Sequence, residues 1–310
     1  MFHMANDSQH FRRQDELEER EGAYPVEGNI WRSPTGDWVP LYEGKMVQAF
    51  DHRASGIVTV EKNLYRPGQG VEASEADHED PSFVPAPRYF VRAENPLSTQ
   101  IALKDVTSTT NARSIIACLL PAYATGHTLP ILDMEVVGSP DRAEAQALFC
   151  ANLNSLILDF VARTKILSNH ASWYIVEQLP VVPPETYGTV KFGSKSAGEI
   201  ICPIVLELTY TAHDIAKFAS DMGHVDGGGL VKAPFVWDDE RRLGLRAKLD
   251  AIYFHLYGIT DRNDVRYIFS TFPVVEREET EAFGRYRSRD LCLAYMSALA
   301  AGDPDVEVDL

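Results

Sequence analysis

Residues 149–161 have the sequence FCANLNSLILDFV. Their apolar side chains recur at intervals of three and four residues, which places them on one face of an α-helix. Ser139 is a suitable N-cap for this helix, with Pro140 at the first helical position and Asp141 in the first turn. The pattern therefore predicts a helix from Asp141 to about Lys165 that packs on neighbouring strands.

Upstream of this helix the sequence predicts mainly strands. The turn Pro34-Thr35-Gly36-Asp37 separates two short apolar segments and indicates a β-hairpin. We expect further strands within residues 47–60, 89–91, 101–106 and 114–120. Residues 68–87 carry Gly, Pro and acidic residues, so we expect an exposed loop there.

Downstream of about residue 185 the sequence predicts mainly helices. One runs from about Pro203 to Gly223, a second from Asp239 to Tyr257, and two shorter ones lie near residues 264–269 and 288–300. The expected fold class is α+β. A linker or helix (1–23) precedes a mixed α/β target-recognition domain (24–185), and a mostly helical C-terminal region follows (186–310).

Composition narrows the class of protein. The chain has 310 residues, of which 45% are hydrophobic, so it can bury one sizeable core and form one or two domains. Residues 1–16 lack the apolar run of a signal peptide, and the apolar stretch 115–120 is too short to cross a bilayer. We therefore expect a cytoplasmic protein without membrane contact. The four cysteines have no CxxC spacing, which argues against a disulfide framework and a zinc site.

The net charge of −16 is unevenly distributed along the chain. Residues 1–81 contain 8 basic and 16 acidic residues, and residues 200–310 contain 12 and 19. Residues 82–199 contain 9 basic and 10 acidic residues, so this middle third is nearly neutral. A strongly acidic chain is a poor general DNA-coating protein, because phosphate binding needs Lys and Arg. The basic residues of the middle third can still gather on one face.

Motifs of several enzyme classes are absent from the sequence. It contains neither the Gly-rich turn that binds S-adenosylmethionine nor the Asn/Asp-Pro-Pro-Tyr/Phe tetrapeptide of adenine methylases. HExxH and a Gly-x-Ser-x-Gly elbow are also missing, and Pro140-Asp141 has no ExK near it to complete a nuclease PD…ExK motif. We therefore expect no catalytic, cofactor-binding or metal-binding residues in this chain, although the sequence leaves open whether it belongs to an enzyme.

Several segments nevertheless resemble one family of DNA methylases. Three segments are similar to the region after the catalytic domain of Eco57I-like restriction-modification methylases, which are of the type IIG and phage-defence kind. They are Pro40–Met46, Phe50–Arg53 and Thr110–Arg113. Asn152–Arg163 with Glu177–Pro180 is similar to target-recognition domains more widely, including those of type I specificity subunits. The resemblance extends from Asn6 to Met296, through residues 239–258, 267–272 and 284–287.

The resemblance implies a role in reading DNA sequence for an adenine-N6 methyltransferase. The implied partners are double-stranded DNA and a methylase domain, supplied upstream or in trans, that binds S-adenosylmethionine. This chain can be a separate specificity subunit, the product of a split gene or a fragment of a longer protein. Arg and Lys read guanine in the major groove, and Asn and Gln read adenine. The candidate DNA-binding residues are Lys45, Arg53, Arg88, Arg92, Asn111, Arg113, His127 and Thr128.

Other interpretations remain open at this point. Each candidate arginine is as well explained by an ion pair, Arg53 with Asp51 in particular, and His127 by a structural role. The whole chain is alternatively a protein-interaction adaptor of a defence complex that docks a partner through its acidic C-terminal third. A decoy that mimics DNA is less favoured, because it would spread its carboxylates evenly.

Overall fold

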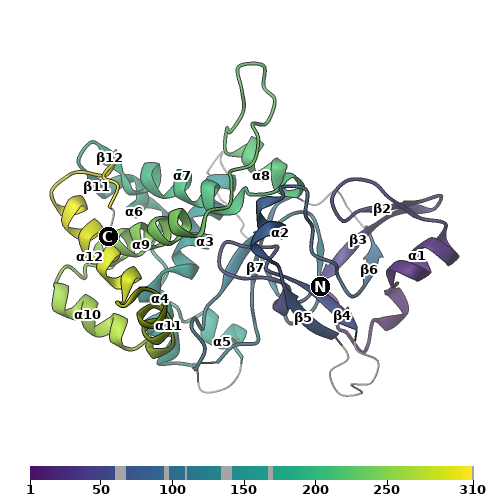
Figure 1. Cartoon of the computed structure of the whole chain (residues 1–310), viewed down its shortest axis with the longest axis horizontal. Coiled ribbons are helices and arrows are strands. Elements are labelled where there is room, and N and C mark those ends of the chain that lie inside the picture. The colour runs from purple at the N-terminus through teal and green to yellow at the C-terminus, as the bar shows by residue number, and fades with distance from the viewer. Residues whose placement is uncertain (60–67, 94–97, 109, 134–141, 167–169, 309–310) are drawn as a thin grey trace. The chain divides into compact units, whose positions relative to one another are not determined.

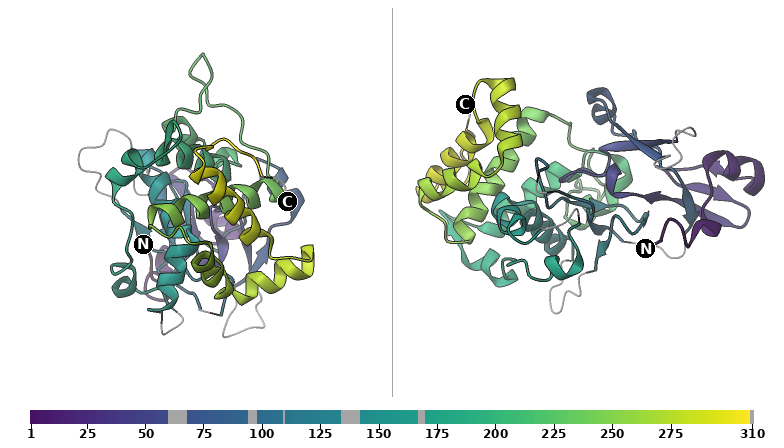
Figure 2. Two further views of the ribbon diagram at one scale, coloured as in Figure 1. Left: turned by 90° about the vertical axis from the view of Figure 1, so that its left-hand side faces the viewer. Right: turned by 90° about the horizontal axis from the view of Figure 1, so that it is seen from below.

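The chain folds into two compact units, neither of which is contiguous in sequence. The computed structural model describes residues 1–59, 68–93, 98–108, 110–133, 142–166 and 170–308 (Figures 1 and 2). Unit 1 comprises Met1–Asp105, Ala117–Ala143 and Thr209–Trp237, and unit 2 comprises Val106–Ile116, Glu144–Leu208 and Asp238–Leu310. The sequence had instead suggested three consecutive segments.

The largest sheet of unit 1 contains the predicted hairpin. Its antiparallel strands are ordered β1 (Tyr24–Pro25), β2 (Trp31–Ser33), β3 (Gly36–Tyr42) and β6 (Phe90–Arg92), and β9 (Ala124–Thr125) pairs with β3 in parallel. Trp31 pairs with Trp38 across the hairpin. Gly36 has a φ of +131° at the turn, which a residue with a side chain rarely adopts.

Two smaller sheets and several short helices complete unit 1. β4 (Ser55–Thr59) pairs with β5 (Gly68–Glu72), and β7 (Gln100–Leu103) lies between β8 (Ala117–Leu120) and β10 (Ile131–Leu132). The expected loop 68–87 is partly wrong, because it contains β5 and the helix α2 (Glu75–Glu79), which Ser74 caps. The other helices are η1 (Ser8–His10), α1 (Gln14–Glu21), η2 (Gly44–Met46), η3 (His213–Ile215) and α8 (Ala216–Asp221).

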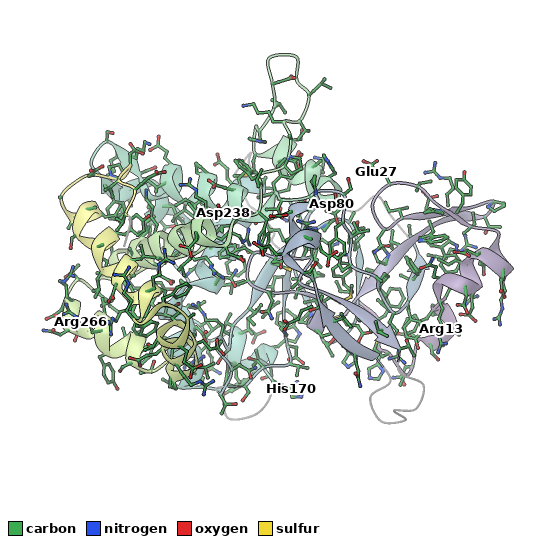
Figure 3. All side chains as sticks on the ribbon, viewed as in Figure 1. Arg13, Glu27, Asp80, His170, Asp238 and Arg266 are labelled. Atoms are coloured by element: carbon green, nitrogen blue, oxygen red, sulfur yellow. The ribbon has the colours of Figure 1, made fainter. Side chains whose placement is uncertain are left out.

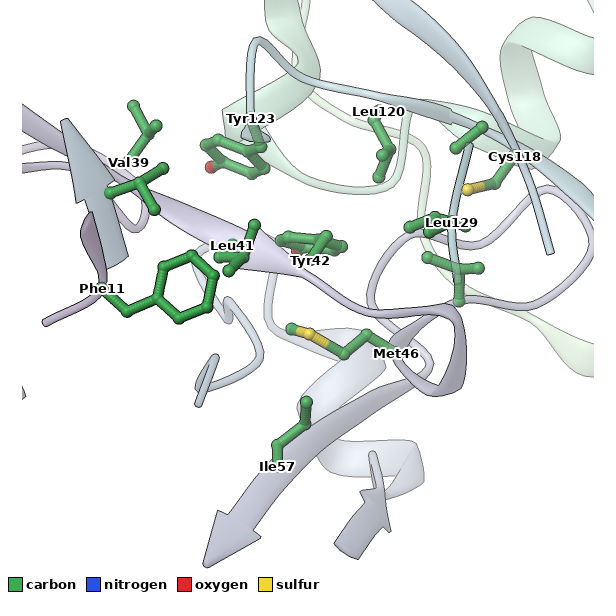
Figure 4. Close-up of a cluster of buried hydrophobic side chains, with 13 residues drawn as sticks. Phe11, Val39, Leu41, Tyr42, Met46, Ile57, Cys118, Leu120, Tyr123 and Leu129 are labelled. Atoms are coloured by element: carbon green, nitrogen blue, oxygen red, sulfur yellow. The ribbon is translucent and has the colours of Figure 1, made fainter. Parts of the chain in front are cut away.

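The core of unit 1 forms between these sheets. Figure 4 shows its main cluster, in which β3 contributes Val39, Leu41 and Tyr42. Side chains from β4, from β8 and from the turn after β9 pack around them, among them Ile57, Cys118 and Leu129. A second cluster joins α1 to the sheet through Leu17, Trp31, Trp38 and Phe90. Burial of these apolar surfaces is the main force that orders the strands.

Unit 2 is mostly helical. The single helix predicted from Asp141 to Lys165 is wrong in one respect, because it is two helices, α3 (Arg142–Asn154) and α4 (Leu156–Arg163). Ser155 separates them, and its side chain accepts a hydrogen bond from the Leu158 amide as the N-cap of α4. The predicted cap Ser139–Asp141 lies outside the described residues. The expected packing on strands is also not seen for α4, which packs against α9 (Asp239–Leu256) and α10 (Arg262–Ser270).

The remaining helices partly follow the predicted pattern. The single helix expected from about Pro203 to Gly223 is two helices, α7 (Ala197–Thr209), which begins earlier than expected, and α8. α8 ends shortly before Gly223, which has a φ of +75°. α12 (Arg287–Ala300) is close to its predicted range and packs on α9, whereas α11 (Pro273–Phe283) was not predicted. The other elements are α5 (Trp173–Val176), α6 (Pro184–Thr189) and the hairpin of β11 (Lys191–Phe192) and β12 (Lys195–Ser196).

The α+β fold class is therefore confirmed, although the helical part begins at Arg142 and not near residue 186. Among the described residues, no single helix is long and apolar enough to cross a membrane. The consecutive helices α3 and α4, which are bent by 54° relative to each other, are together long and apolar enough for a membrane span by length and composition alone.

Candidate nucleic-acid interface

Four of the eight predicted DNA-binding residues, the adjacent His127 and Thr128 with Lys45 and Arg88, lie in unit 1 around Gly44 and the start of β5. The Gly44 amide donates a hydrogen bond to Thr128 Oγ1 at 3.2 Å, and Lys45 Nζ donates to the Gly68 carbonyl at 2.9 Å. A Cβ on Gly68 would lie 3.3 Å from Arg88 Cδ. Lys45, Arg88 and Thr128 therefore lie on one local surface.

This surface also includes Lys104 and His127. A Cβ on Gly44 would lie 3.6 Å from Lys104 Cγ and only 2.6 Å from the Thr128 carbonyl, so only glycine fits there. His127 precedes Thr128, is exposed and stacks on His3 at a centroid distance of 4.8 Å. We call Lys45, Arg88, Lys104, His127 and Thr128 the Gly44 surface.

The Gly44 surface carries three cationic side chains of partial exposure. Glu43 Oε2 lies 3.1 Å from Lys45 Nζ, so the carboxylate neutralises part of this positive charge. The Lys45 side chain is nevertheless 37% exposed. The Arg88 guanidinium lies 4.7 Å above the Tyr89 ring, which holds it in place. Burial lowers the pKa of Lys104 from its ordinary value. Together these groups offer donors that suit phosphate oxygens.

Arg92 lies elsewhere in unit 1, on β6. Its guanidinium stacks over the Trp38 ring at 4.4 Å, and its Nη2 lies 3.3 Å from a carboxylate oxygen of Glu21. The side chain is 38% exposed. Arg92 is therefore ion-paired, as the sequence left open, but it is still accessible to a ligand.

Arg53 does not lie on any surface, and the expectation that it contacts DNA is wrong for this residue. It is 0% exposed, and its guanidinium donates to the carbonyls of His78, Asp80, Phe83 and Thr211 (Asp80 is labelled in Figure 3). The Asp51 carboxylate accepts a hydrogen bond from the Arg53 amide at 2.8 Å. Burial lowers the pKa of Arg53. Its role is to fix the segments 78–83 and 209–215 to unit 1.

His52 forms a second buried contact beside Arg53. Its Nε2 lies 2.9 Å from Asp214 Oδ1, and the two side chains are 1% and 2% exposed. Tyr123 donates to the same carboxylate at 3.2 Å. Burial acts to raise the pKa of Asp214, but His52 and Arg53 overcome this effect and lower it below its ordinary value. The segment 50–53 thus has a structural role in unit 1.

Arg113 belongs to unit 2 and is bound to the α3–α4 junction. Its Nε lies 2.9 Å from Asp159 Oδ2, and it donates to the Asn154 carbonyl. Asp159 also accepts from the Ser114 amide at 3.1 and 3.0 Å. The Arg113 side chain is 23% exposed, so it is held mainly by the protein itself.

The other matched segments of unit 2 join the same network. Arg163 donates to the backbone carbonyls of Asn111 and Ala112 at 2.8 and 2.9 Å. Asn111 itself is an exposed residue. Asn152 accepts from the Val182 amide at 2.7 Å and donates to Tyr257, whose hydroxyl donates to the Pro180 carbonyl. Segments 110–113, 152–163 and 177–180 are therefore connected within unit 2.

The sequence interpretation missed two cationic residues of unit 1. Lys104 lies within the predicted strand 101–106 but directly follows the observed strand β7, a position that a search of true strand ends would have selected. Arg12 lies in the polar N-terminal segment, where no pattern distinguishes it. Among residues that the structure describes, no group of three or more His, Cys, Asp or Glu is arranged to hold a metal ion.

Comparisons of the chain with protein-family models, with curated proteins and with solved structures found no match. The functional assignment therefore depends on the residues and their arrangement.

Proposed function

We propose that this chain is the DNA sequence-recognition part of a restriction-modification or phage-defence adenine-N6 DNA methyltransferase. It would position the target adenine for a methylase domain outside this sequence. That domain would bind S-adenosylmethionine, because the Gly-rich turn and the tetrapeptide that hold the cofactor and the adenine are missing here.

The observation that carries the proposal is the connection of the matched segments within unit 2. Segments that resemble the methylases at separate places in the sequence, 110–113 and 152–163, are joined through Arg113, Asp159 and Arg163. These contacts join the segments within one compact unit, as expected if they form part of one recognition region.

The Gly44 surface of unit 1 supplies the chemistry for DNA contact. Lys45, Arg88 and Lys104 provide positive charge for phosphates, while His127 and Thr128 offer polar groups for base edges. The net charge of −16 opposes DNA binding over most of the chain. We therefore expect weak binding, restricted to one surface and sensitive to salt.

The test is a fluorescence-anisotropy titration of labelled DNA duplexes with the purified chain at several salt concentrations. We expect Lys45→Ala and Arg88→Ala to weaken binding to all sequences, and each to lower the salt slope by about one. His127→Ala or Thr128→Ala should relax the preference at one base position, at a cost of roughly 1–3 kcal/mol for that base. The control is Lys232→Ala, because Lys232 is an exposed lysine of unit 1 that does not belong to the Gly44 surface.

The absence of salt-sensitive binding to any duplex would contradict the proposal. It would favour the alternative that the chain is an adaptor of a defence complex, without base readout. An effect of Lys232→Ala as large as those of Lys45→Ala and Arg88→Ala would show that the interface lies elsewhere.

A further inference from the structure

A cavity in unit 1 is lined by residues other than those of the Gly44 surface, although its residue Phe2 accepts a hydrogen bond from the His127 amide. Its volume is about 150 Å³, and its polar lining consists of Gln9, His10, Arg12, Glu21, Trp38 and Arg92. A single water needs about 10–15 Å³ by the same measure, so the cavity has room for a polyatomic group. The segment before α1, the end of α1, and strands β3 and β6 bring these residues together.

Two arginines and one tryptophan dominate the chemistry of the cavity. The guanidinium carbons of Arg92 and Arg12 lie 4.4 and 5.6 Å from the centroid of the Trp38 ring. Glu21 binds both, with Oε1 3.1 Å from Arg12 Nε and Oε2 3.3 Å from Arg92 Nη2. One carboxylate therefore holds two cations, and the group keeps an excess of one positive charge.

Some hydrogen-bond donors of this group already have acceptors within the protein, because Arg12 Nη1 donates to the carbonyls of Gln9 and Phe11 at 3.1 and 2.9 Å. The Trp38 indole Nε1 and Arg92 Nη1 are buried without a hydrogen-bond partner among the described residues. Because these two nitrogens are buried, a ligand in the cavity would contact the exposed parts of the Arg12 and Arg92 side chains instead. The Arg12 and Arg92 side chains are 31% and 38% exposed, which leaves them accessible from solvent.

Two carboxylates of this region, Asp37 and Glu16, are engaged by other groups. Asp37, which precedes Trp38, forms an ion pair with Arg32 at 2.9 Å. Glu16 of α1 binds Arg20 at 2.9 Å and accepts from the amide of Arg13, which is labelled in Figure 3. These pairs reduce the negative potential that α1 would otherwise impose on an anion in the cavity.

We propose that this cavity binds a phosphate group, with Arg12 and Arg92 as charged donors. Guanidinium groups form strong, directional hydrogen bonds with phosphate oxygens, and two of them around one pocket suit a phosphate better than a neutral ligand. The phosphate comes either from a nucleic-acid backbone or from a small phosphorylated molecule. The site goes beyond the proposed function and does not require that the chain read a DNA sequence.

The experiment measures binding of inorganic phosphate, deoxyadenosine monophosphate and a short DNA duplex by calorimetry, at constant ionic strength. We expect Arg92→Gln and Arg12→Gln each to weaken phosphate binding at least tenfold. The matched control is Arg32→Gln on β2, because Arg32 is paired with Asp37 and does not line the cavity. Thermal unfolding of each variant verifies that it is folded.

Competition identifies the source of the phosphate. If inorganic phosphate displaces the duplex and Arg92→Gln weakens both, the site holds the DNA backbone. If the monophosphate binds through Arg92 and the duplex is unaffected, the site belongs to a small molecule, and Lys45→Ala still tests DNA recognition separately. The proposal is overturned if neither phosphate nor the monophosphate binds the folded chain, or if Arg32→Gln weakens binding as much as Arg92→Gln.

Discussion

Asp159 of α4 is one buried carboxylate that holds two arginines and a backbone amide. Its side chain is 0% exposed, with oxygens 2.9 Å from Arg113 Nε and 3.5 Å from Arg163 Nε. Asp159→Ala would leave both guanidiniums without their anion, and the Ser114 amide without its acceptor. Removal of one partner from a buried ion pair costs about 3–5 kcal/mol, because the remaining charge is unpaired in the interior.

The expected loss is large for a unit of this size. At about 2–4 °C per kcal/mol, the unfolding temperature of unit 2 should fall by about 6–20 °C. Burial contributes to this sensitivity, since the Arg113 and Arg163 side chains are only 23% and 11% exposed. The assay is thermal and urea unfolding followed by circular dichroism and calorimetry, which resolve the two units if they unfold separately.

The matched control removes an exposed ion pair of the same unit. Asp305 is 70% exposed and lies 2.6 Å from Lys195 Nζ, so Asp305→Ala should cost at most about 1 kcal/mol. If Asp159→Ala destabilises the protein no more than Asp305→Ala does, Asp159 does not hold the matched segments together. The structural argument for unit 2 would then be refuted.

Three further predictions concern backbone conformation, pH and the cofactor. Gly193→Ala should destabilise unit 2 more than Gly223→Ala destabilises unit 1, as measured by urea unfolding. Both glycines have positive φ, which costs roughly 1–2 kcal/mol for alanine, but a Cβ on Gly193 would also lie 2.3 Å from the Gly302 carbonyl. Burial raises the pKa of Asp250 to about 6, so the folded state binds the proton more tightly than the unfolded state. The stability contributed by Asp250 is then lost as the pH rises from about 4 to 6. Asp250→Asn should therefore be more stable than the wild type at pH 8, by at most about 3 kcal/mol, and this difference should vanish near pH 4. The purified chain should give no calorimetric signal with micromolar S-adenosylmethionine; measurable binding would contradict the assignment of the cofactor to another domain.

Local signals in the sequence predicted the elements that depend on local chemistry. The hairpin of β2 and β3 follows from its turn residues, and α9 from its apolar face and the glycine at position 258. The break at Ser155 was missed because apolar periodicity continues through it. α11 was missed because its acidic sequence has no buried face.

Long-range contacts determine what the sequence alone did not reveal. Residues 106–116 belong to unit 2, where Arg113 and Ser114 bind Asp159. Arginine is a residue type that usually lies on the surface. Arg53 is buried because its guanidinium binds backbone carbonyls that lie far from it in the sequence, and the sequence pattern gives no sign of these contacts. The same limitation applies to the Gly44 surface, since the approach of Thr128 to Gly44 joins segments that no periodicity connects.

The central claim, that this chain reads DNA sequence, is tested most directly by selection from a library of randomised duplexes. The purified chain is mixed with the library at low salt, bound duplexes are recovered, and their sequences are compared with those of the starting pool. The account predicts enrichment of a short shared sequence that contains adenine, and weaker enrichment with His127→Ala or Thr128→Ala. Recovery of duplexes without any shared sequence, at every salt concentration at which the chain binds, would contradict it.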